Sequence, residues 1–235
     1  MKTNLLLPIA GNGQRFIDAG YTVPKPLIEI NGKTILDRSL ESVKLDNCNL
    51  IFIIRQDHVK EHNLNLILKS RYKDCKIVVI PGLTEGALST CMLAKEHIDN
   101  DMPLMIFTPD CYFEPQINPD NINESFDGMV CVFNSNSPAH SYVKLDENAE
   151  YVNNTAEKKV ISNLAIGGLY YWKNGSDFVK YGNQMIEKDL RVNGEFYIAP
   201  VFNEFISDGN KVGIDRNTKH DILGTPEDLE NNKWT

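Results

Sequence analysis

The first half of the chain alternates strand-length apolar runs with helix-length amphipathic patterns, and this alternation limits the possible folds more than any other feature. The apolar runs that predict strands cover residues 5–9, 50–54, 77–80 and 103–108. The patterns that predict helices lie between them, at residues 34–43, 58–68 and 84–97. Strands joined by helices are typical of βαβ units, whose crossovers place the strands parallel in one sheet. We therefore expect an α/β fold with a mainly parallel sheet and helices on both faces.

The second half has shorter and more strictly alternating apolar runs. They predict strands at residues 129–133, 142–145, 159–162, 165–172 and 212–214, and helices at residues 178–186 and 200–206. Because alternation favours antiparallel strands with one face toward solvent, we expect a small antiparallel extension of the sheet. No internal repeat or low-complexity linker separates the two halves, and residues 116–127 predict a loop. The sequence therefore predicts one domain over residues 1–235.

The charge balance narrows the choice of partners. The 235 residues include 24 Lys and Arg against 32 Asp and Glu, a net charge of −8. This excess of acid argues against nucleic acid or an anionic membrane as a partner, because both recruit cations. No apolar run reaches the roughly 18 residues of a membrane span, and the five cysteines, none in a C-x-x-C pair, favour reduced thiols in a cytoplasmic protein. A few placed cations must therefore bind any anionic substrate.

A glycine-rich turn follows the first predicted strand. Gly11 and Gly13 tolerate positive φ angles and leave backbone N–H groups uncovered, which allows close approach to phosphate. The dinucleotide-binding fingerprint G-x-G-x-x-G needs a third glycine where Phe16 stands, so a Rossmann dehydrogenase is disfavoured. A Walker A loop is disfavoured as well, because Leu27 occupies the position of its first glycine. Residues 31–32, Asn-Gly, instead predict a hairpin turn.

The residues around this turn carry a stronger signal than the glycines alone. The chain reads LLLPIAGNGQRF over residues 5–16 and PKPLI over residues 24–28. This order and spacing closely resemble the N-terminal motif of the sugar-1-phosphate nucleotidyltransferases, or NDP-sugar pyrophosphorylases, and similar segments extend the resemblance to residue 229. The resemblance implies a Rossmann-like fold of the GT-A type. It also implies a nucleotide-binding half at residues 1–115 and an acceptor-binding half at residues 116–235.

By this resemblance, the glycine-rich loop receives the triphosphate of a nucleotide. The two catalytic cations would be Arg15 and Lys25, which suit a nucleoside triphosphate of about four negative charges. The alternative is a loop arginine and a loop lysine that are fixed only by turn geometry. The nucleotide-binding residues of this loop would be Ala10, Gly11, Asn12 and Gly13.

A second loop resembles the segment that meets the nucleobase in this family. It reads GLTEGA over residues 82–87, and the small residues Gly86 and Ala87 leave room for a flat base against the chain. Glu85 would accept a hydrogen bond from an exocyclic amine, which favours cytosine or guanine. Alternatively, Glu85 is a first-turn carboxylate that complements a helix dipole.

Two acidic positions resemble the family's metal ligands. Asp110 follows the strand predicted at residues 103–108, where open α/β sheets place ligands, and would bind Mg²⁺ together with phosphate oxygens. Tyr112 lies where a sugar transferase would have the second acid of D-x-D, which disfavours that class. The family's second aspartate lies two residues before Gly224, but Ile222 occupies this position. Either the loop is adjusted so that Asp221 serves, or this ligand is absent.

Four residues of the second half resemble positions that line the acceptor pocket in the family. Glu157 would meet acceptor hydroxyls and Lys158 the acceptor phosphate, although both also fit a solvated charge run. Gly168 belongs to a glycine-bearing strand that lines the pocket, and Glu195 would bind a polar group of the acceptor.

The resemblance implies that an NTP and a sugar 1-phosphate react to give an NDP-sugar and pyrophosphate, by in-line attack of the acceptor phosphate on the α-phosphate. One alternative is a cytidylyltransferase that acts on a phosphorylated non-sugar molecule such as phosphocholine. Another is a nucleotide-binding domain without catalytic activity. The expected cofactor is Mg²⁺, the partners are the two phosphorylated substrates, and assembly into a homo-oligomer stays open. Enzymes of this kind commonly feed capsule or lipopolysaccharide synthesis.

Overall fold

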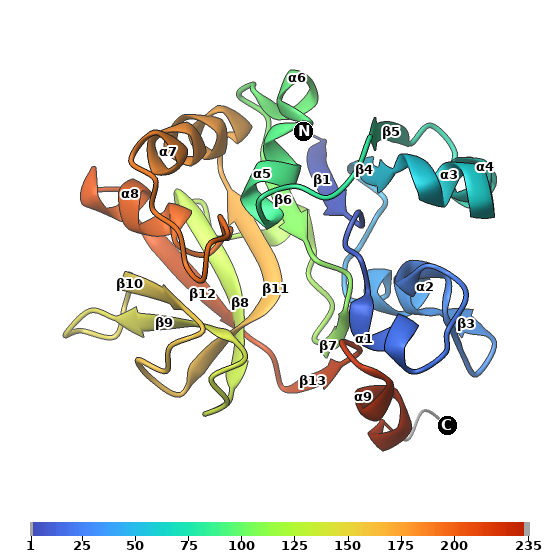
Figure 1. The fold of residues 1–235 in the computed structure, drawn as a ribbon. Coiled ribbons are helices and arrows are strands. Elements are labelled where there is room, and N and C mark those ends of the chain that lie inside the picture. The colour runs from blue at the N-terminus through green and yellow to red at the C-terminus, as the bar shows by residue number, and fades with distance from the viewer. Residues whose placement is uncertain (1, 233–235) are drawn as a thin grey trace.

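The computed structural model describes residues 2–232, and its core is a nine-stranded sheet. Four neighbouring strands of this sheet are parallel, in the spatial order β6-β1-β4-β5. The apolar runs that predicted strands are mostly buried in β1, β4 and β6, whereas in β5 only Ile80 is buried, and the carboxyl ends of the four strands lie at one edge (Figure 1). The four strands are β1 (Thr3–Pro8), β4 (Cys48–Arg55), β5 (Lys76–Ile80) and β6 (Leu104–Phe107).

The other strands extend the sheet on the far side of β6. β11 (Leu164–Trp172) pairs antiparallel with β6, β8 (Gly128–Asn134) and β9 (Ser141–Leu145). β10 (Val152–Glu157) pairs antiparallel with β9, and β12 (Val212–Arg216) runs parallel to β8. The prediction of a Rossmann-like mixed sheet with an antiparallel extension is therefore confirmed.

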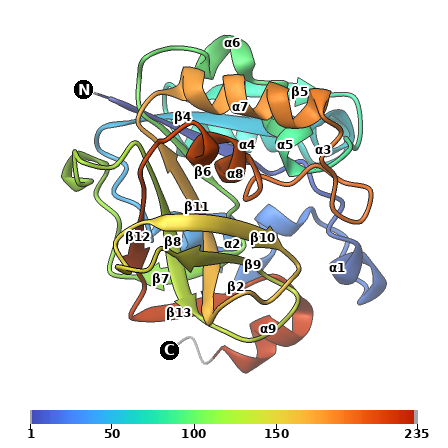
Figure 2. The same cartoon turned by 90° about the vertical axis from the view of Figure 1, so that its left-hand side faces the viewer.

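Helices cover both faces of the sheet because successive side chains of β1 point to opposite faces. Leu6 joins the apolar cluster that contains the helices α5 (Ala87–Met92), α6 (Lys95–Ile98), α7 (Gly175–Glu187) and α8 (Val201–Ser207), of which α7 contacts the other three (Figure 2). Leu5 and Leu7 join the opposite cluster, with α2 (Ile35–Leu40), α4 (Leu64–Arg71) and, at its edge, α3 (Gln56–His62).

Three predicted elements differ from the structure. The helix expected at residues 58–68 is two helices, α3 and α4, because Asn63 adopts a left-handed conformation with φ 51°. The helix expected at 84–97 begins only at Ala87, breaks before α6, and leaves Leu93 exposed. The strand expected at 159–162 is wrong, because Lys158, with φ 51°, turns the chain directly after β10.

Short elements outside the nine-stranded sheet complete the fold. The hairpin of β2 (Glu29–Ile30) and β3 (Lys33–Thr34) has the predicted turn, with positive φ at both central residues. An unpredicted ribbon pairs β7 (Cys111–Glu114) with β13 (Lys219–Ile222). The Thr225 side chain caps α9 (Pro226–Asn231) by accepting a hydrogen bond from the Asp228 N–H. The remaining short helices are α1 (Gln14–Asp18), η1 (Lys25–Leu27) and η2 (Pro119–Asn121). Within residues 2–232, no helix has the length and apolarity to cross a membrane.

Candidate active site

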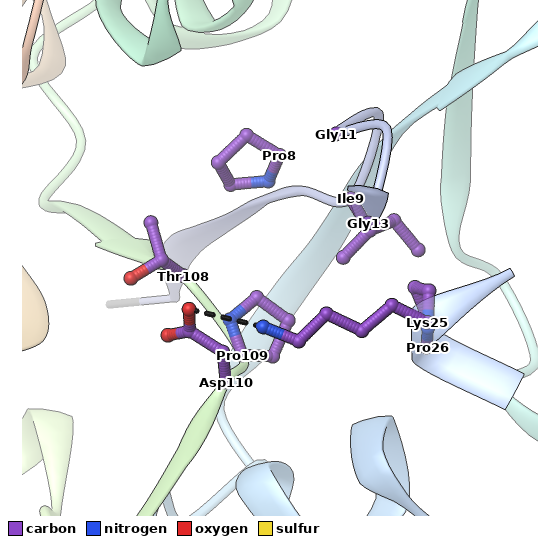
Figure 3. A pocket seen from close by; sticks show the side chains of 9 residues that line it. All are labelled: Pro8, Ile9, Gly11, Gly13, Lys25, Pro26, Thr108, Pro109 and Asp110. Carbon is purple, nitrogen blue, oxygen red and sulfur yellow. Dashed lines mark hydrogen bonds and ion pairs between the residues drawn. The ribbon is translucent and has the colours of Figure 1, made fainter. Parts of the chain in front are cut away.

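The predicted catalytic lysine and the predicted metal ligand form an ion pair at the carboxyl edge of the sheet. Asp110 follows β6, Lys25 begins η1, and the Lys25 Nζ lies 3.2 Å from the Asp110 Oδ2 (Figure 3). The Asp110 side chain is 45% exposed and that of Lys25 only 20%, so the pair faces a cavity. This cavity of about 200 Å³ is lined by Pro8, Ile9, Gly11, Gly13, Lys25, Pro26, Thr108, Pro109 and Asp110.

The glycine-rich loop forms one wall of this 200 Å³ cavity, which we call the nucleotide pocket. Gly13 caps α1 in a left-handed conformation with φ 64°, and a Cβ there would lie 3.4 Å from the Lys25 Cβ. In the described part of the chain, no acceptor contacts the backbone N–H groups of Gly11, Asn12 or Gly13. Arg15 is exposed on α1 and does not line the pocket. The loop therefore presents unpaired donors beside Lys25.

A second cavity of about 170 Å³ lies on the other side of Asp110, and we call it the acceptor pocket. The two cavities share Thr108 and Asp110. Two predicted acceptor residues, Glu157 and Gly168, line the new cavity. The other residues that line it are Cys111, Phe133, Ala139, His140, Ser141, Ile166, Gly167, Tyr170, His220 and Ile222.

Glu157 is the carboxylate of the acceptor pocket that lies away from Asp110. It ends β10, and its carboxylate accepts a hydrogen bond from the Ser141 hydroxyl at the start of β9. Burial raises the pKa of Glu157, while the hydrogen bond from Ser141 and the nearby Lys158 act in the opposite direction. The side chain is therefore held in place with one acceptor oxygen available to a hydroxyl or amine.

Two histidines of the acceptor pocket were not singled out by sequence reasoning. The His220 ring stacks on Phe133 with centroids 3.9 Å apart, and its Nδ1 lies 3.1 Å from the Asn217 amide nitrogen. Burial lowers the pKa of His220 to about 4 and lowers that of His140 as well, so both are neutral near pH 7. No local motif marks them, because β13 and the β8–β9 connection meet only in the folded sheet.

Lys158 and Glu195 lie together outside the lining of the acceptor pocket. The Lys158 Nζ donates to the Tyr197 hydroxyl, which in turn donates to the Glu195 carboxylate. The ammonium also lies 4.6 Å from the centre of the Tyr197 ring. The hydrogen bond to Tyr197 raises the pKa of Lys158, so this cation stays charged near the pocket.

The loop at residues 82–87 packs directly against the segment that contains Glu195. The Phe196 N–H donates to the Glu85 carbonyl over 2.7 Å, and a Cβ on Gly86 would lie only 2.4 Å from the Phe196 carbonyl oxygen. The Glu85 carboxylate pairs with Arg191 at 3.2 Å. Because α5 begins at Ala87, Glu85 is not a first-turn carboxylate, and this alternative is wrong.

Asp221 is not brought to Asp110. Side chains alternate along β13, and it is His220 and Ile222 that line the acceptor pocket, whereas the Asp221 carboxylate lies 3.4 Å from the Lys219 Nζ. Residues 2–232 contain no group of three or more His, Cys, Asp and Glu side chains suited to a metal ion. Asp110 is therefore the carboxylate of this site that could hold a metal beside substrate phosphates.

Residues 5–231 match the family model described as nucleotidyl transferase, so the chain belongs to this family, as its motifs indicated. A solved nucleoside-diphosphate-sugar pyrophosphorylase from Vibrio cholerae RC9 is 25% identical, with a TM-score of 0.84 over 96% of this chain and 98% of that chain. The CTP:phosphocholine cytidylyltransferase of Streptococcus pneumoniae shares the fold, with a TM-score of 0.75 at 14% identity over 98% of this chain and 97% of that chain.

Among curated proteins, the bifunctional protein GlmU of Methanococcus aeolicus is 24% identical over 227 residues, 94% of this chain and 51% of its own length. The GlmU protein of Methanocaldococcus jannaschii is 26% identical over 96% of this chain and 52% of its own length. The chain thus spans about half the length of the curated relatives that it matches. The likeness covers nearly all of this chain, including both pockets.

Proposed function

We propose that the protein transfers a nucleotidyl group from an NTP to a sugar 1-phosphate and releases pyrophosphate. The observation that carries this proposal is the position of Asp110 and Lys25 at the junction of two pockets. Backbone N–H groups line one pocket and suit a triphosphate, whereas Glu157 and Ser141 in the other suit hydroxyl groups. The two substrates would therefore meet beside this ion pair.

The acceptor phosphate oxygen attacks the α-phosphorus in line, the new P–O bond forms as the bond to the β-phosphate oxygen breaks, and pyrophosphate leaves with that electron pair. No general base is required, because the nucleophile is already an anion. The task of the protein is alignment and charge neutralisation. Lys25 stabilises the α-phosphate, Arg15 the leaving pyrophosphate and Lys158 the acceptor phosphate.

Mg²⁺ is the metal we propose for this site, with Asp110 as its protein ligand. Mg²⁺ is usually bound by one or two carboxylates together with substrate phosphates, and a half-exposed carboxylate at the seam of two pockets fits this arrangement. When bound, the ion neutralises phosphate charge. Lys25, which pairs with Asp110 in the free protein, would bind a phosphate oxygen in the nucleotide pocket.

The distribution of lining residues supports the proposed division into two halves. The residues that line the nucleotide pocket all lie within 1–115. The acceptor pocket takes Thr108, Asp110 and Cys111 from that half, and its other lining residues come from 116–235.

The described cysteines are all free, which supports a cytoplasmic location as part of the same proposal.

A pyrophosphate-release screen tests this function. CTP, UTP, dTTP, ATP and GTP are each combined with a panel of sugar 1-phosphates and phosphorylated non-sugar molecules in the presence of Mg²⁺. We expect release with one sugar 1-phosphate and its preferred NTP. Release only with a non-sugar phosphate would establish the cytidylyltransferase alternative. NTP binding without release for every pair would overturn catalysis in favour of a binding domain.

A further inference from the structure

The carboxyl end of β4 lies beside the glycine-rich loop. Pro8, the last residue of β1, is level with Ile53 of β4, and the Ile9 N–H donates to the Ile53 carbonyl over 3.0 Å. β4 continues for two residues beyond this point, to Arg55. The side chain of Arg55 therefore starts next to the loop that leaves β1, although it is 40 or more residues away in sequence from that loop.

Arg55 is a buried arginine whose charge is already compensated. The residue is only 8% exposed. Its Nε donates to the Asp57 Oδ1 over 2.9 Å and its Nη2 donates to the Asp57 Oδ2, so the pair is bidentate. The hydrogen bond from Arg55 lowers the pKa of Asp57 to about 2. The third donor, Nη1, reaches the Asn12 Oδ1 at 3.2 Å. A planar guanidinium fixed in this way has a set direction, and that direction is toward the loop.

Asn12 transmits this contact to the loop and to the following helix. Its Nδ2 donates to the Gln14 Oε1 over 2.6 Å, and the Gln14 amide donates to the Asp18 Oδ1 over 2.7 Å. Within residues 2–232, the hydrogen bond from Arg55 to Asn12 is the only one that joins a side chain of residues 10–13 to the sheet. A segment with glycines on both sides of Asn12 loses much conformational entropy when it is ordered. A loop that is already ordered before phosphate arrives would lose less conformational entropy on binding.

We propose that Arg55 is a positioning residue for the nucleotide: through Asn12 it holds the glycine-rich loop, before substrate arrives, in the conformation whose N–H groups receive the triphosphate. This inference rests on the proposed function of that loop. Arg55 does not line the nucleotide pocket, and its guanidinium is engaged by Asp57 and Asn12, so it acts on the loop through Asn12. Its contribution is preorganisation, which appears in nucleotide affinity.

The test compares Arg55→Met and Asn12→Ala with the wild-type protein. Calorimetry with Mg²⁺ and the preferred NTP gives the Kd, and pyrophosphate release gives KM and kcat for both substrates. We expect each variant to weaken NTP binding about tenfold, the loss of one charge-assisted hydrogen bond. The KM for the acceptor should stay unchanged. The double variant should be no weaker than the weaker single variant, because both substitutions remove the same contact.

Arg71→Met is the matched control. Arg71 pairs with Asp37 at 2.6 Å between α4 and α2 and lines neither pocket, so its loss should lower stability without changing NTP affinity. Unchanged NTP affinity in Arg55→Met, or additive losses in the double variant, would overturn the inference. If Arg55→Met does not fold, Asn12→Ala decides, because Asn12 is exposed. If the wild-type protein binds NTP but releases no pyrophosphate, the proposed activity is wrong. The NTP affinities of the variants can still be compared in that case, so the two failures are distinguishable.

Discussion

The two pockets that meet at Asp110 are built in different ways. The nucleotide pocket consists of backbone, glycine and proline from short continuous segments, with Lys25 as its cation. The acceptor pocket consists of side chains from segments that lie far apart in the chain, including β8, β10, β11 and β13. Under the proposed function, backbone donors would bind the triphosphate that every NTP carries, whereas the side chains of the acceptor pocket would select the acceptor.

The largest effect is expected from Lys25, which lines the nucleotide pocket and pairs with Asp110, a residue that lines both pockets. Lys25→Met should reduce kcat/KM by about 10²-fold or more, the size seen when an electrostatic contact to a transition state is removed. The reduction should be similar for every NTP and acceptor pair that the wild-type protein uses.

Lys33→Met is the control for this experiment, since Lys33 is an exposed hairpin lysine that pairs with Glu41. Its steady-state kinetics should match the wild type. Pyrophosphate release by Lys25→Met at the wild-type rate would remove Lys25 from the mechanism.

The next largest effect is expected from Gly168, which lies where the two pockets adjoin. Gly168 has φ 77°, and a Cβ there would lie 2.8 Å from the Thr108 Oγ1, an atom of a residue that lines both pockets. Gly168→Ala should lower the free energy of unfolding by about 2 kcal/mol through backbone strain and crowding. It should also raise KM for both substrates, which distinguishes the seam from either pocket.

Gly20→Ala separates strain from crowding, because Gly20 has φ 88° and no atom within 4 Å of a Cβ. Urea unfolding should show a loss of about 1 kcal/mol for this control. Equal losses for the two variants would mean that contact with Thr108 has no influence.

The contrast between continuous segments and segments far apart in the chain also explains how much of the fold the sequence predicts. The prediction of the Asn31-Gly32 turn is correct because its signal lies within two adjacent residues. β10 was missed because its sequence, VNNTAE, is polar. It forms because Thr155 turns inward and donates to the Ala199 carbonyl over 2.8 Å, a contact that no local pattern reveals.

The candidate site likewise contains residues that local motifs identify and residues that only long-range pairing brings there. The motifs identified Lys25 and Asp110, which the structure brings within 3.2 Å: Asp110 follows β6, and Lys25 belongs to the connection that leaves the carboxyl end of the neighbouring strand β1. His220 reaches the acceptor pocket only through the pairing of β13 with β7, which joins residues about a hundred positions apart. Arg55 depends in a similar way on the register of β4 against β1. Long-range register is the information that single-sequence patterns lack.

A smaller and more selective effect is expected in the acceptor pocket. Glu157→Gln keeps the shape of the side chain but removes its charge, so it should raise KM for the acceptor about tenfold, as for one hydrogen bond to a charged group. KM for the NTP should not change. The exposed Glu147 provides the control Glu147→Gln, and equal changes in the two KM values would contradict the separation of the pockets.

The smallest effect is the dependence of stability on pH that Glu157 of the acceptor pocket contributes. Burial raises the pKa of Glu157 above its ordinary 4.5, with Glu195 acting in the same direction and Ser141 and Lys158 against it. A carboxyl whose pKa is raised by folding favours the folded state while it is protonated, and this contribution is lost as pH rises through the folded-state pKa. The free energy of unfolding of the wild type relative to Glu157→Gln should therefore fall as the pH rises above the ordinary carboxyl pKa of 4.5. Urea titrations of both proteins across this range measure the difference, and a difference that grows with pH would show that Glu157 is stabilised as a carboxylate in the free protein.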